Sequence, residues 1–396
     1  MEYLRLNECA TFSDKRTKNI LLESYISTEN MIPNKGGICL AESIPNSKSA
    51  SKYEPQDILL SNIRPYFRKI WYADREGSCS NDVLILKAKK GIDPKFLYYV
   101  LSDNNFFNYN TVTSKGTKMP RGSKKAIMKY LVPNLDLSSQ RRIASILSAY
   151  DNLIENNNKR IRLLEQMAEN LYKEWFVRFR FPGYEKTEFE NGLPKGWEER
   201  KIGDWGIMLD TGNRPKGGID DSLSDGIPSL GAEAIKNLAS FDYSSTRYIP
   251  REFYDKMKRG RNTGNDILLY KDGAYIGKVT LFRDGFPFSE YAINEHVFFI
   301  SPMAKDYNTY LYFTLHQEAY FSLMQNLNRN AAQPGLSRPD IERVKIIVPS
   351  VSIINEYNLI VEPMLSNIFK LAKQNTLLAK QRDLLLPRLM SGKLEV

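Results

Sequence analysis

The chain has 396 residues, of which 42% are hydrophobic and 26% charged, so its length and composition favour two globular domains joined by a connector. Its formal net charge of +10 favours a polyanionic partner. The sequence contains no run of about 18 apolar residues, the length needed to span a membrane. The N-terminal segment lacks the apolar stretch of a signal peptide, and Cys9, Cys39 and Cys79 form neither an even disulfide set nor a metal motif, so a cytoplasmic location is expected.

The first half predicts short strands, each followed by a loop or a helix. Residues 57–60 (DILL) are strand-like and lead into a basic, proline-marked loop, SNIRPYFRK at 61–69. A second strand is predicted at 81–86 (NDVLIL) and a helical aromatic stretch at 96–107. A short β-branched run at 129–133 (KYLVP) is stopped by its proline.

A basic segment, KGTKMPRGSKKAIMK at 115–129, precedes this last strand and contains no acidic residue. Glycines and a proline interrupt it, so part of it is a loop rather than one helix face. Loops place cations against phosphates readily, which favours nucleic acid as the polyanion.

A long helix is predicted next, because apolar residues recur at steps of four and three with no glycine or proline between them. At ~1.5 Å per residue its length is roughly 50 Å. The seam of this helix consists of Ile143, Leu147, Tyr150, Ile154, Asn157, Ile161, Leu164, Ala168, Leu171 and Trp175.

The second half repeats this order after a linker at 179–196 that is rich in glycine, proline and charge. The order indicates two copies of one large unit rather than a solenoid array; the alternative is a chance resemblance between α/β segments. The repeated segments are DILL at 266–269, its loop YKDGAYIGK at 270–278, and the stretches 294–300, 310–321 and 345–349.

A second long helix closes the chain. We expect Pro363 to fix its start and Pro387 to kink or end it. Its seam is also interrupted by an asparagine and consists of Met364, Ile368, Leu371, Asn375, Leu378, Arg382, Leu385 and Leu389.

The two seams fit each other as an antiparallel pair if Asn157 faces Asn375. Two facing amides satisfy each other and select one register over its slips; the alternative is that each asparagine faces solvent. Arg382 then lies opposite Tyr150, and its long side chain can leave the seam and reach water. The other predicted pairs are Ile143–Leu389, Leu147–Leu385, Ile154–Leu378, Ile161–Leu371, Leu164–Ile368 and Ala168–Met364.

Each globular part precedes its own helix, so an antiparallel pair would separate the two parts and relate them by an approximate two-fold axis. A body of this shape suits two separated, inverted half-sites on duplex DNA, at ~34 Å per turn.

Four segments in this order resemble the specificity subunit of type I restriction–modification systems. Residues 140–176 (QRRIASILSAYDNLIENNNKRIRLLEQMAENLYKEWF) look like its central conserved region, and 330–349 (NAAQPGLSRPDIERVKIIVP) like the close of a recognition domain. GLPKGWE at 192–198 looks like the opening of a second recognition domain and LLLPRLMSGKLEV at 384–396 like its ending. The first copy departs from the pattern, with TKMPRGSKKAIMK in place of AQPGLSRPDIERV.

The resemblance implies an α+β fold with two similar α/β target-recognition domains, separated by a long antiparallel two-helix coiled coil and related as a pseudo-two-fold internal repeat. The implied division is 1–138 first recognition domain, 139–178 first spacer helix, 179–196 linker, 197–350 second recognition domain and 351–396 second spacer helix.

The resemblance also implies partners: double-stranded DNA, two methyltransferase (modification) subunits and, in a restricting complex, two restriction (motor–nuclease) subunits, with no membrane. S-adenosylmethionine, ATP and Mg would then belong to those partners, and this chain would need no cofactor or metal. The alternative is an orphan DNA-binding scaffold or regulator without modification partners.

Catalytic motifs are not found in the sequence. GAYIGKV at 273–279 is one residue short of a P-loop and lacks the hydroxyl residue after its lysine. His296 and His316 are the only histidines, and neither is assigned a role. The sequence therefore predicts a non-catalytic DNA-recognition subunit.

Candidate DNA-binding residues are those on loops beside the predicted sheets, because Arg, Lys, Asn and Gln match base edges and phosphates. In the first half they are Arg64, Tyr66, Arg68, Lys69, Lys115, Lys118 and Arg121. In the second half they are Arg214, Lys216, Lys271, Tyr275, Lys278, Arg329, Asn330 and Gln333.

Overall fold

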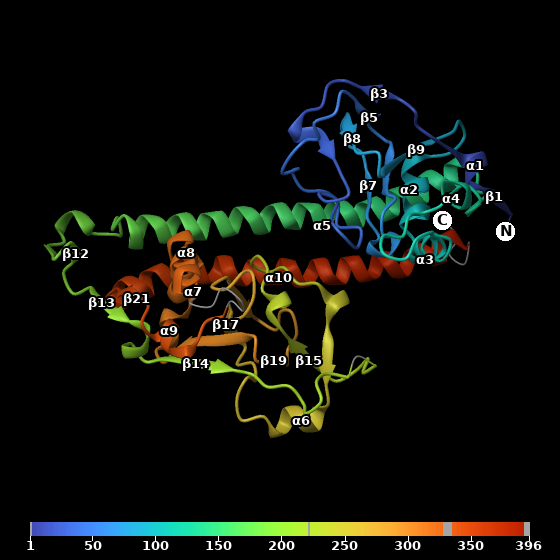
Figure 1. Ribbon diagram of the computed structural model, residues 1–396. Coiled ribbons are helices and arrows are strands. Elements are labelled where there is room, and N and C mark those ends of the chain that lie inside the picture. The colour runs from blue at the N-terminus through green and yellow to red at the C-terminus, as the bar shows by residue number, and fades with distance from the viewer. Residues whose placement is uncertain (1, 221, 328–334, 392–396) are drawn as a thin grey trace. The chain divides into compact units, whose positions relative to one another are not determined.

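The computed structural model describes residues 2–220, 222–327 and 335–391, and its elements are labelled in Figure 1. The chain forms two compact units: unit 1 comprises Met1–Ile154 and Leu377–Val396, and unit 2 comprises Glu155–Thr376. Among the described helices, none combines the length and the apolar composition needed to cross a bilayer.

The main sheet of unit 1 has four antiparallel strands in the order β2-β9-β6-β7. These are β2 Ala10–Phe12, β9 Val83–Ala88, β6 Ile58–Ser61 and β7 Ile70–Tyr72. Because side chains alternate along a strand, Ile58 and Leu60 of β6 enter one core and Leu59 enters another on the opposite face. Burial on both faces explains why DILL is a continuous apolar run.

A second sheet of unit 1 has the order β3-β5-β8-β4, with β4 parallel to β8. Its strands are β3 Arg16–Thr17, β5 Ala50–Tyr53, β8 Gly77–Cys79 and β4 Tyr25–Ile26; β1 Tyr3–Arg5 pairs separately with β10 Leu131–Pro133. The short helices are α1 Leu6–Cys9, α2 Pro94–Ser102, α3 Asn104–Val112 and α4 Lys124–Ile127. Helix α2 begins where it does because Pro94 fits the first turn and Asp93 accepts a bond from Phe96 N at 2.8 Å.

The main sheet of unit 2 has the order β14-β20-β17-β18, again antiparallel throughout. These strands are β14 Ile207–Thr211, β20 Val297–Pro302, β17 Asn265–Tyr270 and β18 Val279–Arg283. The second sheet has the order β16-β15-β19, from β16 Arg247–Ile249, β15 Ile227–Leu230 and β19 Ala292–Ile293. Two further strand pairs are β13 Glu198–Lys201 with β21 Lys345–Val348, and β11 Phe189–Glu190 with β12 Leu193–Pro194. The shorter α-helices of unit 2 are α6 Arg251–Lys256, α7 Asn308–His316, α8 Glu318–Leu327 and α9 Arg338–Glu342.

The internal repeat is confirmed by the strand orders of the two main sheets, which correspond position by position. The two DILL segments form β6 and β17, each in the third position. Asp57 and Asp266 stand at matching places before the apolar run; both are buried and accept backbone bonds, from Glu54 N at 2.8 Å and Thr263 N at 3.0 Å. The second sheets differ, with four described strands in unit 1 and three in unit 2.

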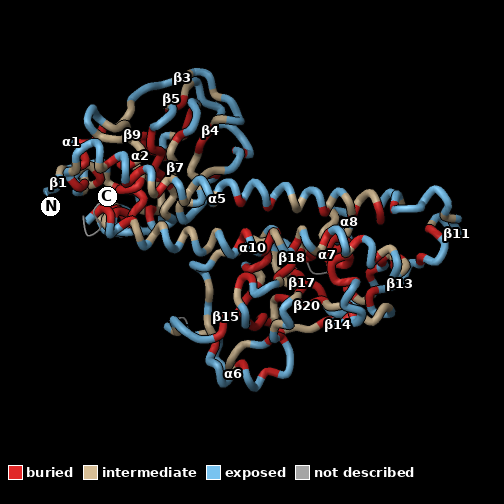
Figure 2. The backbone as a smooth tube through the Cα atoms, turned by 180° about the vertical axis from the view of Figure 1, so that it is seen from behind, coloured by how far each residue is buried: buried red, intermediate tan, exposed pale blue. Residues whose placement is uncertain are grey.

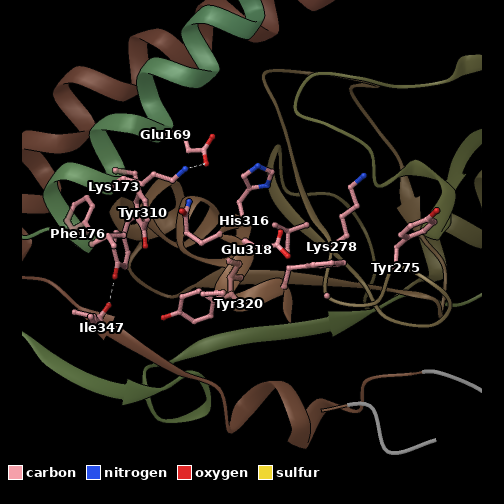
Figure 3. A pocket seen from close by; sticks show the side chains of 18 of the residues that line it. Glu169, Lys173, Phe176, Tyr275, Lys278, Tyr310, His316, Glu318, Tyr320 and Ile347 are labelled. Atoms are coloured by element: carbon pink, nitrogen blue, oxygen red, sulfur yellow. Dashed lines mark hydrogen bonds and ion pairs between the residues drawn. The ribbon is translucent and has the colours of Figure 1, made fainter. Parts of the chain in front are cut away.

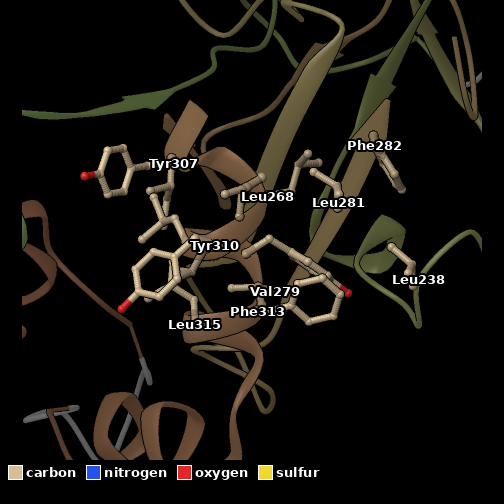
Figure 4. Packing of buried hydrophobic residues seen from close by; sticks show 14 of the residues in the cluster. Leu238, Leu268, Val279, Leu281, Phe282, Tyr307, Tyr310, Phe313 and Leu315 are labelled. Atoms are coloured by element: carbon tan, nitrogen blue, oxygen red, sulfur yellow. The ribbon is translucent and has the colours of Figure 1, made fainter. Parts of the chain in front are cut away.

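The core of unit 2 lies between α7 and the main sheet, as the buried segments in Figure 2 and the side chains in Figure 4 show. Each fully buried side chain of this size contributes roughly 1.5–3 kcal/mol. The packed residues include Leu268, Val279, Leu281, Phe282, Tyr310, Phe313 and Leu315.

The two long helices are α5 Leu137–Tyr172, continued by one π-helical turn at Lys173–Val177, and α10 Val351–Met390. Both contribute to both units, and within each unit they run antiparallel. In unit 2, Asn157 Nδ2 donates to Asn375 Oδ1 at 2.9 Å, and the rings of Trp175 and Tyr357 lie 5.9 Å apart. These contacts belong to one register, the one that the sequence predicts for the asparagine pair.

The predicted start of the second helix at Pro363 is wrong, because α10 begins at Val351 and runs through the proline. Proline removes the N–H that would bond to the carbonyl of Leu359. Leu359 is 78% exposed, so water can satisfy that carbonyl, while Val361 and Leu365 are buried and hold the helix on both sides of Pro363. Tertiary packing thus overrides the local stop signal.

Close to Pro387 the helix ends, since α10 continues only to Met390, and Ser391 N bonds to the Pro387 carbonyl at 3.1 Å. A further expectation for this helix needs correction. Arg382 does not extend into water: its side chain is 19% exposed and bonds to Asp151 Oδ1 at 2.6 Å and to Asp383. A neighbouring carboxylate on α5, one position from the predicted partner Tyr150, keeps the guanidinium at the helix pair.

Replacing Asn157 by leucine should lower the free energy of unfolding by ~1 kcal/mol, because the partly buried pair loses one hydrogen bond. The loss is small because Asn375 Nδ2 still donates to Asn158 Oδ1 at 2.8 Å. The double variant Asn157→Leu/Asn375→Leu should lose less than the sum of the single variants, as measured by melting temperatures. Strict additivity would show that the two amides do not act as a pair.

The pKa of Glu165 on α5 is raised from 4.5 to about 7, first by burial and then by the Glu169 carboxylate. Because its pKa is raised in the folded state, the protonated Glu165 makes its full contribution to the stability of the fold below pH 4.5. That contribution is lost as the pH rises through about 7. Glu165→Gln should therefore raise the melting temperature of the protein above pH 7 but not below pH 4.5. Glu155→Gln, at an exposed i,i+4 ion pair with Lys159 on the same helix, is the control. An equal effect of Glu165→Gln at both pH values would contradict this assignment.

Candidate nucleic-acid interface

In unit 1 the fold brings the two predicted basic loops together. The loop that follows β6 spans 62–69, and the basic part of the loop before α4 spans 115–123. Arg64 N bonds to the Pro120 carbonyl at 2.8 Å, and Gly122 N bonds to the Asn62 carbonyl at 3.0 Å. Candidates far apart in sequence therefore share one surface region.

The loop after β6 contains a tight turn, which we call the Arg64–Arg68 turn. Arg64 and Arg68 have φ angles of 49° and 53°, in the left-handed region that non-glycine residues seldom adopt. Such a backbone persists only where its surroundings hold it. Here Asn34 N donates to the Phe67 carbonyl at 2.8 Å and Lys35 N to the Arg68 carbonyl at 2.9 Å.

The candidate cations of unit 1 fall into two groups. Lys115 and Lys118 are exposed, and Arg121 is largely exposed although it pairs with Asp82 at 3.1 Å. Lys69 differs, because its ammonium donates to the Thr28 carbonyl at 2.5 Å and burial lowers its pKa. This lysine holds two loops together and is poorly placed to meet a phosphate.

The remaining candidates of unit 1 lie on the Arg64–Arg68 turn. Tyr66 is 47% exposed, and Arg68 donates to Asn104 Oδ1 at 3.2 Å. Arg64 Nε is buried and has no hydrogen-bond partner among the described residues. A buried, unpaired guanidinium N–H is costly, so a rotation of this side chain toward an external acceptor would be favourable.

In unit 2 the candidate cations are held by a cluster of charged residues. Arg214 Nε donates to both carboxylate oxygens of Glu295, at 2.6 and 2.8 Å. Lys271 donates to Asp272 Oδ2 and to the Glu295 carbonyl, both at 3.1 Å, and His296 Nδ1 lies 3.0 Å from Asp272 Oδ2. Burial has the largest single effect on the pKa of Glu295 and raises it, but the bond from Arg214, a backbone bond and the nearby charges of Arg214 and His296 together leave that pKa below its ordinary value.

Other candidates of unit 2 are more open. Lys216 is exposed, and Tyr275 is 62% exposed. Tyr275 and Lys278 border a cleft of about 870 Å³, which Figure 3 shows between them and the aromatic side chains of α5 and α7. Its other lining residues include Tyr172, Phe176, Tyr310, His316 and Tyr320. Arg329, Asn330 and Gln333 lie outside the described residues.

Sequence reasoning missed the residues that position these cations. Asp272, Glu295 and His296 surround Arg214 and Lys271 in unit 2, and Asn34 and Lys35 hold the Arg64–Arg68 turn in unit 1. Local patterns carry no signal for such contacts, although the run Asn34-Lys35-Gly36-Gly37 does indicate a turn.

In the described ranges, no group of three or more His, Cys, Asp or Glu residues could hold a metal ion. What the fold repeats is a sheet whose third strand leads into a loop with cationic side chains. A repeated loop with cationic side chains beside a sheet is typical of proteins that bind DNA.

Comparison with known proteins agrees with this class. The family model of the type I restriction modification DNA specificity domain matches residues 6–166 and again 194–376. The chain therefore belongs to the family of type I restriction–modification specificity subunits, whose members recognise DNA and are not themselves catalytic.

Similar proteins cover most of the chain. The MjaIX specificity subunit of Methanocaldococcus jannaschii is 27% identical over 326 residues, 78% of this chain and 71% of that protein. The HindI specificity subunit of Haemophilus influenzae is 21% identical over 451 residues, 93% and 94% of the two chains. The crystal structure of the type I S subunit from M. genitalium has the same fold, with a TM-score of 0.58, 16% identity and coverage of 98% and 96%.

The two kinds of lysine in unit 1 lead to a direct test. Lys118→Ala should weaken DNA binding and reduce the slope of log affinity against log salt by about 1, because one phosphate contact is lost. Lys69→Ala should lower the melting temperature but leave that slope unchanged, since its ammonium bonds to the Thr28 carbonyl. Binding titrations over a salt series would measure both. Equal slopes for Lys118→Ala and the parent would remove Lys118 from the interface.

Proposed function

We propose that this specificity subunit recognises a bipartite target in double-stranded DNA and directs modification subunits to it, with one half of the target read by each unit. The reading parts correspond to the predicted domains 1–138 and 197–350. The observation that carries the proposal is the repeat itself: β6 and β17 occupy the same place in equivalent sheets, and each leads into a loop with candidate cations.

The loop side chains divide between two tasks. Exposed lysines such as Lys115, Lys118 and Lys216 suit phosphate contacts, because a flexible point charge needs no fixed direction. Arg64, Arg68 and Arg214 suit base edges, because a bidentate contact to guanine needs a guanidinium in one orientation. The backbone bonds around Arg64–Arg68 and the Glu295 pair with Arg214 favour such an orientation.

The long helices carry exposed apolar side chains that suit the docking of modification subunits. In unit 1 these are Leu153, Leu377 and Leu384; in unit 2 they include Leu163, Met167 and Leu359. Contiguous exposed apolar side chains are typical of protein interfaces, and Leu163 and Met167 are such neighbours, four residues apart on α5. We propose that two methyltransferase subunits cover them in the cytoplasm, and that restriction subunits join the same complex to cleave unmodified DNA. S-adenosylmethionine, ATP and Mg would be bound by those partners.

Exchanging residues 1–138 for those of a related specificity subunit tests the division of labour. The complex with modification subunits should then methylate a motif in which one half is changed and the other is kept. Genome-wide mapping of methylated adenines would read out both halves. The reciprocal exchange of 197–350 is the matched control and should change the other half only. A change in both halves after either exchange would refute one half-site per unit.

A further inference from the structure

The Arg64–Arg68 turn is linked to helix α10 through a single lysine, Lys35. We propose that Lys35 is a positioning residue for base readout by unit 1: it does not touch DNA but fixes the turn that does. This inference rests on the proposed function of the turn and names what holds the turn in place.

The first part of the link is a hairpin that ends on the turn. Met31 and Ile38 form an antiparallel bridge, and Ile32 N bonds to the Gly37 carbonyl at 2.8 Å. At its tip, Asn34 and Lys35 have φ angles of 55° and 62°, which directs their consecutive N–H groups to one side. These two groups donate to the carbonyls of Phe67 and Arg68, at 2.8 and 2.9 Å.

The second part of the link is the Lys35 side chain, which is only 11% exposed. Its ammonium lies 3.2 Å from Asp383 Oδ2 on α10. Burial lowers the pKa of Lys35, and the Asp383 carboxylate opposes that change. A buried cation without its partner would be strongly unfavourable, so the ion pair fixes the tip of the hairpin against the helix.

Asp383 is itself held in place by neighbouring groups. It accepts bonds from Arg382 Nε and Nη2 at 3.0 and 2.8 Å, and Arg382 Nη1 donates to Asp151 Oδ1 at 2.6 Å. Asp151 Oδ2 in turn accepts from Tyr99 OH at 2.6 Å. The charges of Lys35 and Arg382 balance those of Asp151 and Asp383, so this partly buried network is neutral as a whole.

Loss of the Lys35 link would alter the direction of the Arg64 and Arg68 side chains more than their affinity for phosphate. The left-handed backbone at Arg64 and Arg68 determines where both Cβ atoms point, and a relaxed turn would move both guanidinium groups. Bidentate readout of a base edge depends on that direction. Loss of the Lys35 link should therefore reduce discrimination between bases in one half-site while leaving the other half-site unaffected.

The test uses the complete complex with modification subunits and measures methylation of three duplexes: the cognate site, one with a substitution in the half read by unit 1, and one with a substitution in the other half. Lys35→Met should raise KM for cognate DNA about tenfold and reduce discrimination in the first half-site by a similar factor, the size of one lost base contact. Its kcat and its discrimination in the second half-site should stay unchanged. Lys35→Arg keeps the charge and should restore the parent values to within about twofold.

Two further variants separate the possible failures. Asp383→Asn breaks the same ion pair from the helix side and should reproduce Lys35→Met; Lys52→Met, at the exposed pair with Glu76 in the same unit, should change nothing. An equal loss in both half-sites, or no loss in the first, would overturn the role of Lys35. Arg64→Ala and Arg68→Ala test the proposed function itself: if they leave DNA binding intact, the turn is not an interface. If they weaken it while Lys35→Met does not, only the link is refuted.

Discussion

The register of α5 against α10 is the constraint on which the rest of the structure depends. In unit 2 it is set by the partly buried bond between Asn157 and Asn375, and the Trp175–Tyr357 contact lies 18 residues away along each helix. A slip by one helical turn would separate the amides inside an apolar seam, where unpaired polar groups are costly. In unit 1 the Asp151–Arg382 pair makes the same demand. Because loops and sheets dock on these helices, their positions within each unit follow from this register.

The two units use one scaffold but hold their candidate readers in different ways. In unit 1 the Arg64–Arg68 turn is held by backbone bonds from a hairpin whose Lys35 is anchored on α10. In unit 2 the cations Arg214 and Lys271 are held by carboxylates of neighbouring loops. A local ion pair orients a single side chain, whereas a clamped backbone orients every side chain of the turn. The ion pairs of unit 2 therefore tolerate substitution of one residue at a time. In the clamped turn of unit 1, a substitution that moves the backbone moves every side chain of the turn.

Sequence patterns predicted the elements that depend on local chemistry. Period and apolar runs located β6, β17 and both long helices, and the steps of four and three were enough to place Asn157 opposite Asn375. The errors arose where distant residues decide: Pro363 lies inside a helix because Val361 and Leu365 are buried on both sides of it. The sequence likewise placed Lys69 among the cations of the loop after β6, but only the fold shows that its ammonium group donates to the Thr28 carbonyl.

This contrast explains how specificity can vary on a constant frame. The apolar runs of β6 and β17 are buried on both faces and each follows a buried aspartate, so substitutions there would disturb the core. The loops that leave these strands carry the partly exposed cations Arg64, Arg68, Lys271 and Lys278, and loops tolerate substitution at less cost to packing than buried strands do. Asp383 is an exception, because it lies on a long helix and yet takes part in holding a reading loop. A change of the Arg64–Arg68 turn in unit 1 is therefore constrained by α10, whereas Arg214 and Lys271 of unit 2 are held by Glu295 and Asp272, which lie on loops.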